Sequence, residues 1–216
     1  MAASDMRSTN TALAPKVGHT QAQNHPQPGS TIRVEPIRQL KDVAMLKKLL
    51  ADQPRDHCIF IMGINTNLRA SDLLAIRIGD VRNLKVGDSF TLRERKTSKL
   101  RRITINRAVH ISVQRLLIAR LNAVDTDYLF ASSRTGNRLT VSTLNKKVKN
   151  WCRNINLPGN YGSHTLRKTW GYMMRTQHGI DIPTLMTIFN HSTQRQTLAY
   201  LGIQETEIQE CYLREI

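Results

Sequence analysis

Four short stretches of this 216-residue sequence carry arginine, lysine, histidine and tyrosine side chains that together could act on a phosphodiester. The segment 66–74 reads Thr-Asn-Leu-Arg-Ala-Ser-Asp-Leu-Leu and sets an arginine at a turn between apolar stretches. Lys96 opens the polar run Lys-Thr-Ser-Lys, and the segment 163–167 reads Ser-His-Thr-Leu-Arg. The fourth stretch runs from His191 to Tyr200. An enzyme that breaks a phosphate ester without a metal ion can use each of these side-chain types.

Each type has its own use in that chemistry. Arginine stays charged, and its planar fork grips two phosphate oxygens as negative charge builds up on them. Tyrosine can attack the phosphorus and hold it in a covalent intermediate. Histidine and lysine can move protons at the attacking and leaving oxygens. Residues three apart share one face of a helix, so His164 and Arg167 could act on the same phosphate.

In this order and spacing, the residues resemble the signature of the tyrosine recombinase (phage integrase) family. That signature is an arginine in a Gly-Leu-Arg-x-x-Glu turn, a lysine on a β-hairpin, a His-x-x-Arg, a Gly-His-Ser and a tyrosine nine residues after that histidine. The positions that fill it here are Arg69, Lys96, His164, Arg167, His191 and Tyr200. The resemblance covers about residues 35–205, and it is to the short forms that lack an N-terminal core-binding domain. It implies a site-specific DNA recombinase or integrase.

The resemblance also implies a mechanism. Arg69 and Arg167 would hold the non-bridging oxygens of the scissile phosphate and stabilise the charge of the transition state. Tyr200 would attack the phosphorus, which gives a 3′-phosphotyrosine and a free 5′-hydroxyl, and a second 5′-hydroxyl would reverse the step. Because the phosphotyrosine conserves bond energy, we expect no cofactor, metal or ATP.

Proton transfer and phosphate binding would fall to three further residues. His164 would act as acid/base for the nucleophile, Lys96 would protonate the leaving oxygen, and His191 would hydrogen-bond the phosphate. Lys99 is the alternative to Lys96, since both belong to the predicted hairpin tip. Tyr212 is a distant alternative to Tyr200.

Three positions depart from the family pattern. Asn67 and Asn190 stand where the family usually has glycine. Asparagine tolerates a positive φ better than most residues, so both changes can preserve the backbone geometry. Asp72 replaces the commoner glutamate; it could orient the active-site groups as a supporting carboxylate, or it could simply favour the start of a helix.

The charge of the chain points to nucleic acid as its partner. It has 32 Lys and Arg against 16 Asp and Glu, a net charge of +16 and a pI near 10.4, and such a surplus is commonly relieved by a polyanion. Three scattered cysteines without a Cys-x-x-Cys pair fit a reducing compartment, so a bacterial cytoplasmic or nucleoid location is expected. With the resemblance, the expected partners are double-stranded DNA, three further copies in a tetramer on DNA, and possible DNA-bending accessory proteins.

The elements that must position these residues follow from the hydrophobic pattern. Three- and four-residue steps predict a helix from Ile37 to Leu50, and others begin at Pro54 and near Ser71. Alternation with period two over 87–106 predicts an antiparallel hairpin with Lys96 and Lys99 at its tip. The predicted helices of the remaining chain cover 109–121 and 144–152 and begin near His164, Ile182 and Gln194. The expected fold is α+β, mainly α-helical, with a small antiparallel sheet.

Three segments are expected along the chain. Residues 1–30, rich in Pro, Gly, Gln and Asn without an apolar period, predict a disordered tail, and residues 31–203 form the catalytic domain. Residues 204–216 form a C-terminal segment that could dock on a partner protomer or pack on its own domain. Two alternatives to a recombinase remain: a catalytically silent DNA-binding accessory protein, and a type IB topoisomerase-like nicking-closing enzyme.

Overall fold

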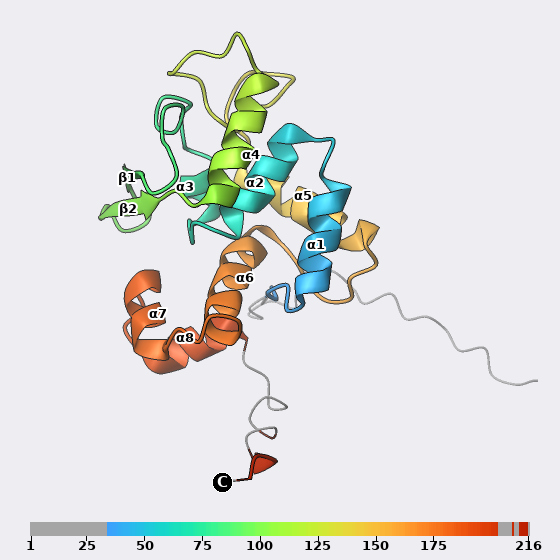
Figure 1. Cartoon of the computed structure of the whole chain (residues 1–216), viewed down its shortest axis with the longest axis vertical. Helices are drawn as coiled ribbons and strands as arrows, with labels where there is room; N and C mark the ends of the chain where they lie inside the picture. Colours follow the sequence, from blue (N-terminus) through green and yellow to red (C-terminus); the bar gives the residue numbers. More distant parts are fainter. Residues whose placement is uncertain (1–33, 203–208, 210–211, 216) are drawn as a thin grey trace, which may run out of the picture. The chain divides into compact units, whose positions relative to one another are not determined.

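The computed structural model describes residues 34–202, 209 and 212–215 (Figure 1). The predicted tail over 1–30 and most of the C-terminal segment 204–216 lie outside these residues. The helices are α1 (Leu40–Leu49), α2 (Pro54–Gly63), α3 (Ala70–Leu73), α4 (Arg107–Ile118), α5 (Val141–Asn154), α6 (Ser163–Thr176), α7 (Ile182–Phe189) and α8 (Gln194–Leu201). The strands are β1 (Ser89–Arg93) and β2 (Leu100–Thr104).

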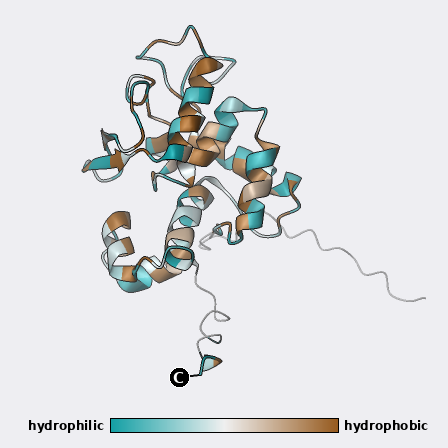
Figure 2. Cartoon of the chain, in the orientation of Figure 1, coloured by the Kyte–Doolittle hydropathy of each residue, from teal (hydrophilic) through white to brown (hydrophobic). Residues whose placement is uncertain are grey.

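The larger of the two hydrophobic cores formed by the described residues is built mainly from α1 to α6. Buried side chains such as Phe60, Leu116 and Trp151 come from different helices and belong to one continuous cluster. Figure 2 shows hydrophobic and hydrophilic stretches alternating along α4, whose Val109 and Leu116 are buried while Ile111 is exposed. The apolar stripe that faces this core is what orders these helices.

The predicted boundaries of two helices are wrong. Ile37 is buried but lies before α1, because the extended chain there donates its N–H to Thr169 Oγ1 at 2.8 Å. The helix predicted through Leu121 ends at Ile118, and Leu121 is 84% exposed. In both cases an apolar residue outside the helix happened to continue its period.

The predicted hairpin is confirmed. The two strands pair antiparallel, with Phe90 opposite Ile103, and both of these side chains are buried on the same face. Thr91 and Arg102, opposite each other on the other face, are exposed. Residues 94–99 form the tip that connects the strands.

A second, smaller core joins α6, α7 and α8. Its buried members are Leu185, Phe189 and Leu201. Gly171 on α6 makes this packing possible, because a Cβ there would lie 2.4 Å from Phe189 Cζ and 2.8 Å from Leu201 Cδ2. Figure 1 shows α8 beside both α6 and α7, in agreement with its contacts. Among the described helices, none is long and apolar enough to cross a membrane.

Candidate active site

Arg69 lies at the turn that connects α2 to α3. Asn67 in this turn has φ 52, so the left-handed backbone predicted from its residue type is present. Arg69 itself has an extended backbone and immediately precedes α3. Its Nη1 forms an ion pair with Glu94 Oε2 at 2.6 Å, and the arginine side chain is only 15% exposed. The turn therefore directs Arg69 toward the base of the hairpin tip.

Glu94 is the negative centre of this part of the site. Its side chain is 5% exposed, and its carboxylate accepts from Thr97 Oγ1 at 2.6 Å and from Arg101 Nη1 at 3.0 Å as well as pairing with Arg69. Burial alone raises the pKa of Glu94, but the hydrogen bonds from Thr97, Arg69 and Arg101 outweigh it and lower the pKa to about 2. The carboxylate thus stays charged and holds two arginines together.

Asp72 ties the hairpin to α3. It is 3% exposed, and its Oδ1 accepts from the backbone N–H of Arg95 at 3.0 Å and from Ser71 Oγ at 3.4 Å. Its Oδ2 is buried without a hydrogen-bond partner among the described residues. Asp72 contacts the backbone next to Lys96, so it is in a position to support the hairpin tip.

The two candidate lysines have different surroundings. Lys96 is exposed at the tip, and its charge is one of those that lower the pKa of His164. Lys99, also exposed, donates from Nζ to Asn190 Oδ1 at 3.0 Å. Asn190, at φ 56, ends α7 in the left-handed conformation. The hairpin tip thus reaches the loop that carries His191.

His164 and Arg167 come from the first turns of α6. Arg167 is 4% exposed; it donates from Nε to Asn67 Oδ1 at 2.9 Å and from Nη2 to the carbonyl oxygen of Phe189 at 3.3 Å. Burial lowers the pKa of Arg167 to about 10, which leaves it charged at neutral pH. His164 is exposed at the start of the helix. The prediction that α6 carries both residues on one face agrees with this arrangement.

His191 and Tyr200 are assembled around Phe189. The rings of Phe189 and His191 stack at 5.2 Å with an interplanar angle of 14°, and Tyr200 lies 5.0 Å from Phe189 and 5.2 Å from His191 between ring centroids. His191 Nδ1 is 3.0 Å from Thr197 Oγ1, one turn before Tyr200 on α8. The Lys168 ammonium lies 5.0 Å from the centroid of the Tyr200 ring. These contacts fix both rings relative to each other.

Electrostatics connect all six candidate residues. Although His164 is exposed, desolvation by neighbouring groups lowers its pKa, as do the charges of Arg167, Lys168, Arg69 and Lys96. Burial likewise lowers the pKa of His191, with further lowering by Arg167 and Arg69. For Tyr200, burial raises the pKa, and the same two arginines oppose that rise. Both histidines are therefore neutral at pH 7, and the tyrosine hydroxyl lies in a positive field.

Sequence reasoning missed several residues that build this site. Glu94, Thr197 and Lys168 were not singled out, although Lys168 directly follows the His-x-x-Arg and Thr197 lies three residues before Tyr200. Phe189, next to Asn190, was not singled out either. Tyr212, the alternative nucleophile, is 86% exposed and takes no part in the contacts described for the site.

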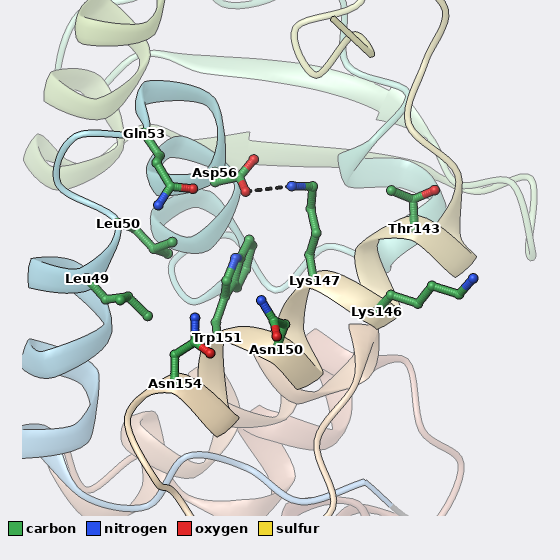
Figure 3. A pocket seen from close by; sticks show the side chains of 10 residues that line it. All are labelled: Leu49, Leu50, Gln53, Asp56, Thr143, Lys146, Lys147, Asn150, Trp151 and Asn154. Atoms are coloured by element: carbon green, nitrogen blue, oxygen red, sulfur yellow. Dashed lines mark hydrogen bonds and ion pairs between the residues drawn. The ribbon is translucent and has the colours of Figure 1, made fainter. Parts of the chain in front are cut away.

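A separate pocket of about 350 Å³ lies between the α1–α2 turn and α5. Figure 3 shows Lys147 reaching across it to Asp56, whose Oδ2 it contacts at 2.7 Å, with Trp151 below them. Asp56 is buried and also pairs with Arg55 at 3.2 Å. None of the six candidate residues lines this pocket, so it is distinct from the candidate active site.

The sequence matches the phage integrase family over residues 34–207. Similar curated proteins are the probable integrase/recombinase YoeC of Bacillus subtilis and tyrosine recombinase XerC of Caldanaerobacter subterraneus. YoeC is 34% identical over 83% of this chain and 95% of its own length. XerC is 31% identical over 76% of this chain, which spans 47% of that relative.

Solved structures agree in fold. XerA recombinase superposes with a TM-score of 0.68 at 21% identity, over 87% of this chain and 65% of that one. XerH bound to a palindromic difH substrate in a post-cleavage complex gives 0.68 at 18% identity, over 84% and 53%.

The mainly helical fold with one small hairpin is that of an integrase catalytic domain, as predicted from the sequence. The chain belongs to the phage integrase family. The predicted function, that of a site-specific tyrosine recombinase or integrase that breaks and rejoins DNA strands, is the function of this family, and the relatives favour neither alternative.

Proposed function

We propose that this chain recombines double-stranded DNA through a 3′-phosphotyrosyl bond to Tyr200. The observation that carries the proposal is the setting of the Tyr200 side chain, which contacts the His191 ring and lies in the field of Arg167 and Arg69. A tyrosine hydroxyl with an ordinary pKa of about 10 is a weak nucleophile at neutral pH, so it needs positive charge and a proton acceptor nearby. Both are supplied by the same cluster.

Strand cleavage would proceed by in-line displacement at phosphorus. The Tyr200 oxygen forms a bond to phosphorus while the bond from phosphorus to the 5′ oxygen breaks. The phenol proton goes to neutral His164, and Lys96 donates a proton to the leaving 5′ oxygen. Arg69, Arg167 and His191 hold the remaining phosphate oxygens. Attack by a 5′-hydroxyl from another strand reverses these transfers, so one phosphodiester replaces another.

DNA binding in this proposal rests on the surplus of positive charge around the site. Arg93, Arg95, Lys96, Lys99 and Arg102 are all exposed on the hairpin. Lys99 contacts Asn190, next to His191, so these exposed basic side chains extend from the candidate site and suit a phosphate backbone. A DNA substrate of this kind also implies action in the cytoplasm or nucleoid.

The C-terminal segment 204–216 is the proposed link between copies of the chain. It holds four glutamates against one arginine, in a protein whose net charge is +16. An acidic segment of one copy can dock on a basic neighbour, and four such contacts would close a ring. A homotetramer on DNA, helped where necessary by accessory proteins that bend the duplex, fits strand exchange between two sites.

The experiment is covalent trapping on nicked duplexes of random sequence, from which a short 5′ fragment diffuses away after cleavage. The wild-type protein is expected to give a denaturant-resistant adduct on the 3′-phosphate side, and sequencing its DNA identifies the target. Tyr200→Phe removes one oxygen and should abolish the adduct, whereas Tyr212→Phe, the matched control, should retain it.

Two results would contradict the proposal. An adduct that persists in Tyr200→Phe and vanishes in Tyr212→Phe would assign the nucleophile to the other tyrosine. Failure of the wild-type protein to form any adduct while it still binds duplex would favour the silent accessory protein.

A further inference from the structure

Asn67 occupies a position whose backbone conformation favours glycine. Its φ of 52 lies in the left-handed region, where glycine is the least strained residue. The residue is also 1% exposed, so its polar amide has been removed from water. A buried amide costs free energy unless it is hydrogen-bonded, so its partners indicate what the side chain does.

Both ends of the amide are used, on two different helices. Oδ1 accepts from Arg167 Nε on α6 at 2.9 Å. Nδ2 donates to the carbonyl oxygen of Ile188, near the end of α7, at 3.4 Å. The amide therefore connects the α2–α3 turn to α6 and to the end of α7, just before the loop that carries His191, across sequence separations of 100 and 121 residues.

The bond to Nε determines which edge of Arg167 is left for a ligand. A guanidinium has five N–H donors in a fixed plane. Asn67 Oδ1 takes the Nε donor, and the carbonyl oxygen of Phe189 takes one on Nη2. The two hydrogen bonds of Arg167 within the described residues involve Nε and Nη2 and leave Nη1 unused. These two bonds lie on the Nε–Nη2 edge and fix the plane of the guanidinium. The second hydrogen of Nη2 and a hydrogen of Nη1 form the neighbouring edge, which is left for two oxygens of one phosphate.

We propose that Asn67 is a positioning residue for Arg167, acting through the Nε hydrogen bond to aim the guanidinium at the scissile phosphate. This inference rests on the proposed function, in which Arg167 holds that phosphate. The glycine usual at this turn could supply the backbone conformation but no acceptor for Nε. Asn67 thus adds a contact to the site beyond its tolerance of a positive φ.

The test uses Asn67→Gly, which suits the backbone and removes only the amide. Asn156→Gly is the matched control, because Asn156 has φ 54, is exposed and lies after α5, away from the site. On the nicked duplex selected by wild-type trapping, at saturating protein, Asn67→Gly is expected to slow adduct formation about 10- to 100-fold, the scale of a misplaced catalytic group. Duplex affinity should change less than threefold, and Asn156→Gly should match wild type in both measurements.

A double-mutant cycle with Arg167→Ala separates positioning from general structural damage. Arg167→Ala should lose about 10²- to 10³-fold in cleavage rate. Adding Asn67→Gly to it should cost less than a further twofold, because the group being positioned is gone. A further drop of tenfold or more would overturn the proposal, since Asn67 would then act elsewhere.

The arms of the experiment distinguish its two possible failures. Wild-type cleavage by Arg167→Ala would refute the proposed function itself. Loss of cleavage in Arg167→Ala together with unchanged cleavage in Asn67→Gly would refute only the role of Asn67. Should Asn67→Gly fail to fold by its thermal unfolding curve, Asn67→Asp replaces it. Asp keeps an oxygen acceptor for Nε but offsets part of the arginine charge, so the rate of adduct formation by Asn67→Asp should lie between those of wild type and Arg167→Ala. A rate at or below that of Arg167→Ala would overturn the inference.

Discussion

Glu94→Gln tests whether a buried carboxylate holds the site together. Gln is nearly the same size as Glu and can still accept from Thr97, but it removes the charge that pairs with Arg69 and Arg101. Both arginines are only 15% exposed, so they would lose a counter-ion in a region of reduced dielectric. The variant should therefore be less stable at neutral pH, and the deficit should depend on pH.

The pKa of Glu94 sets the size of the effect. The pKa is lowered from an ordinary 4.5 to about 2 in the folded protein. At about 1.4 kcal/mol per pKa unit, that corresponds to about 3 kcal/mol of stability at pH 7, similar to the roughly 3–5 kcal/mol for breaking a buried ion pair. Because the folded pKa is depressed, this stability is fully present above 4.5 and is lost as pH falls toward 2. At pH 3 about 1.4 kcal/mol should remain by the same linkage.

Urea unfolding followed by tryptophan fluorescence at pH 7, 5, 4 and 3 measures the difference between wild type and variant. Other titrating groups affect both proteins alike and cancel in the comparison. Asp125→Asn is the control: its ion pair with Arg82 is at the surface, with the carboxylate side chain 64% exposed, so it should cost less than about 1 kcal/mol. A Glu94→Gln deficit of equal size at pH 7 and pH 3 would show that packing, rather than charge, sets the loss.

Two further substitutions probe the geometry of the site. Gly171→Ala would place a Cβ against Phe189 and Leu201, so it should destabilise the fold by about 1–3 kcal/mol. It should also slow adduct formation while the affinity for duplex DNA changes little. Wild-type cleavage by this variant would show that the packing of the Phe189, His191 and Tyr200 rings is not needed for alignment. Lys96→Ala should block cleavage of an ordinary phosphodiester but not of one with sulfur as the 5′ bridging atom, since a thiolate leaves without a proton. If that rescue occurs instead in Lys99→Ala, Lys99 is the acid.

Local sequence signals predicted most of the elements. The period-two run over 87–106 and the helical period of α4 to α6 need only neighbouring residues, and the family signature rests on separations along the chain. Asn67 and Asn190 were expected in the left-handed conformation because of their residue type, and both adopt it. Such features are determined by the residue itself or by its closest neighbours.

What could not be predicted depends on contacts between distant segments. Glu94 lies 25 residues from Arg69 in the sequence, and only the folded chain brings their side chains together. The amide of Asn67 meets Arg167 from 100 residues away. Ile37 continues a helical period, yet a hydrogen bond to Thr169 holds it in an extended segment. A single sequence carries no signal for such pairings.

The charges of the site also explain why its geometry needs several supports. Arg69 and Arg101 pair with one buried carboxylate, Glu94, and the charges of both arginines act on Arg167, which is itself desolvated. Like charges at close range repel, so in the free protein this arrangement must be held by hydrogen bonds and ring contacts. A phosphate entering the site would supply the missing negative charge and relieve that repulsion. The desolvated arginines that repel one another in the free protein are also the groups that would bind the scissile phosphate. Because DNA would bind the folded state, DNA binding should raise the free energy of unfolding.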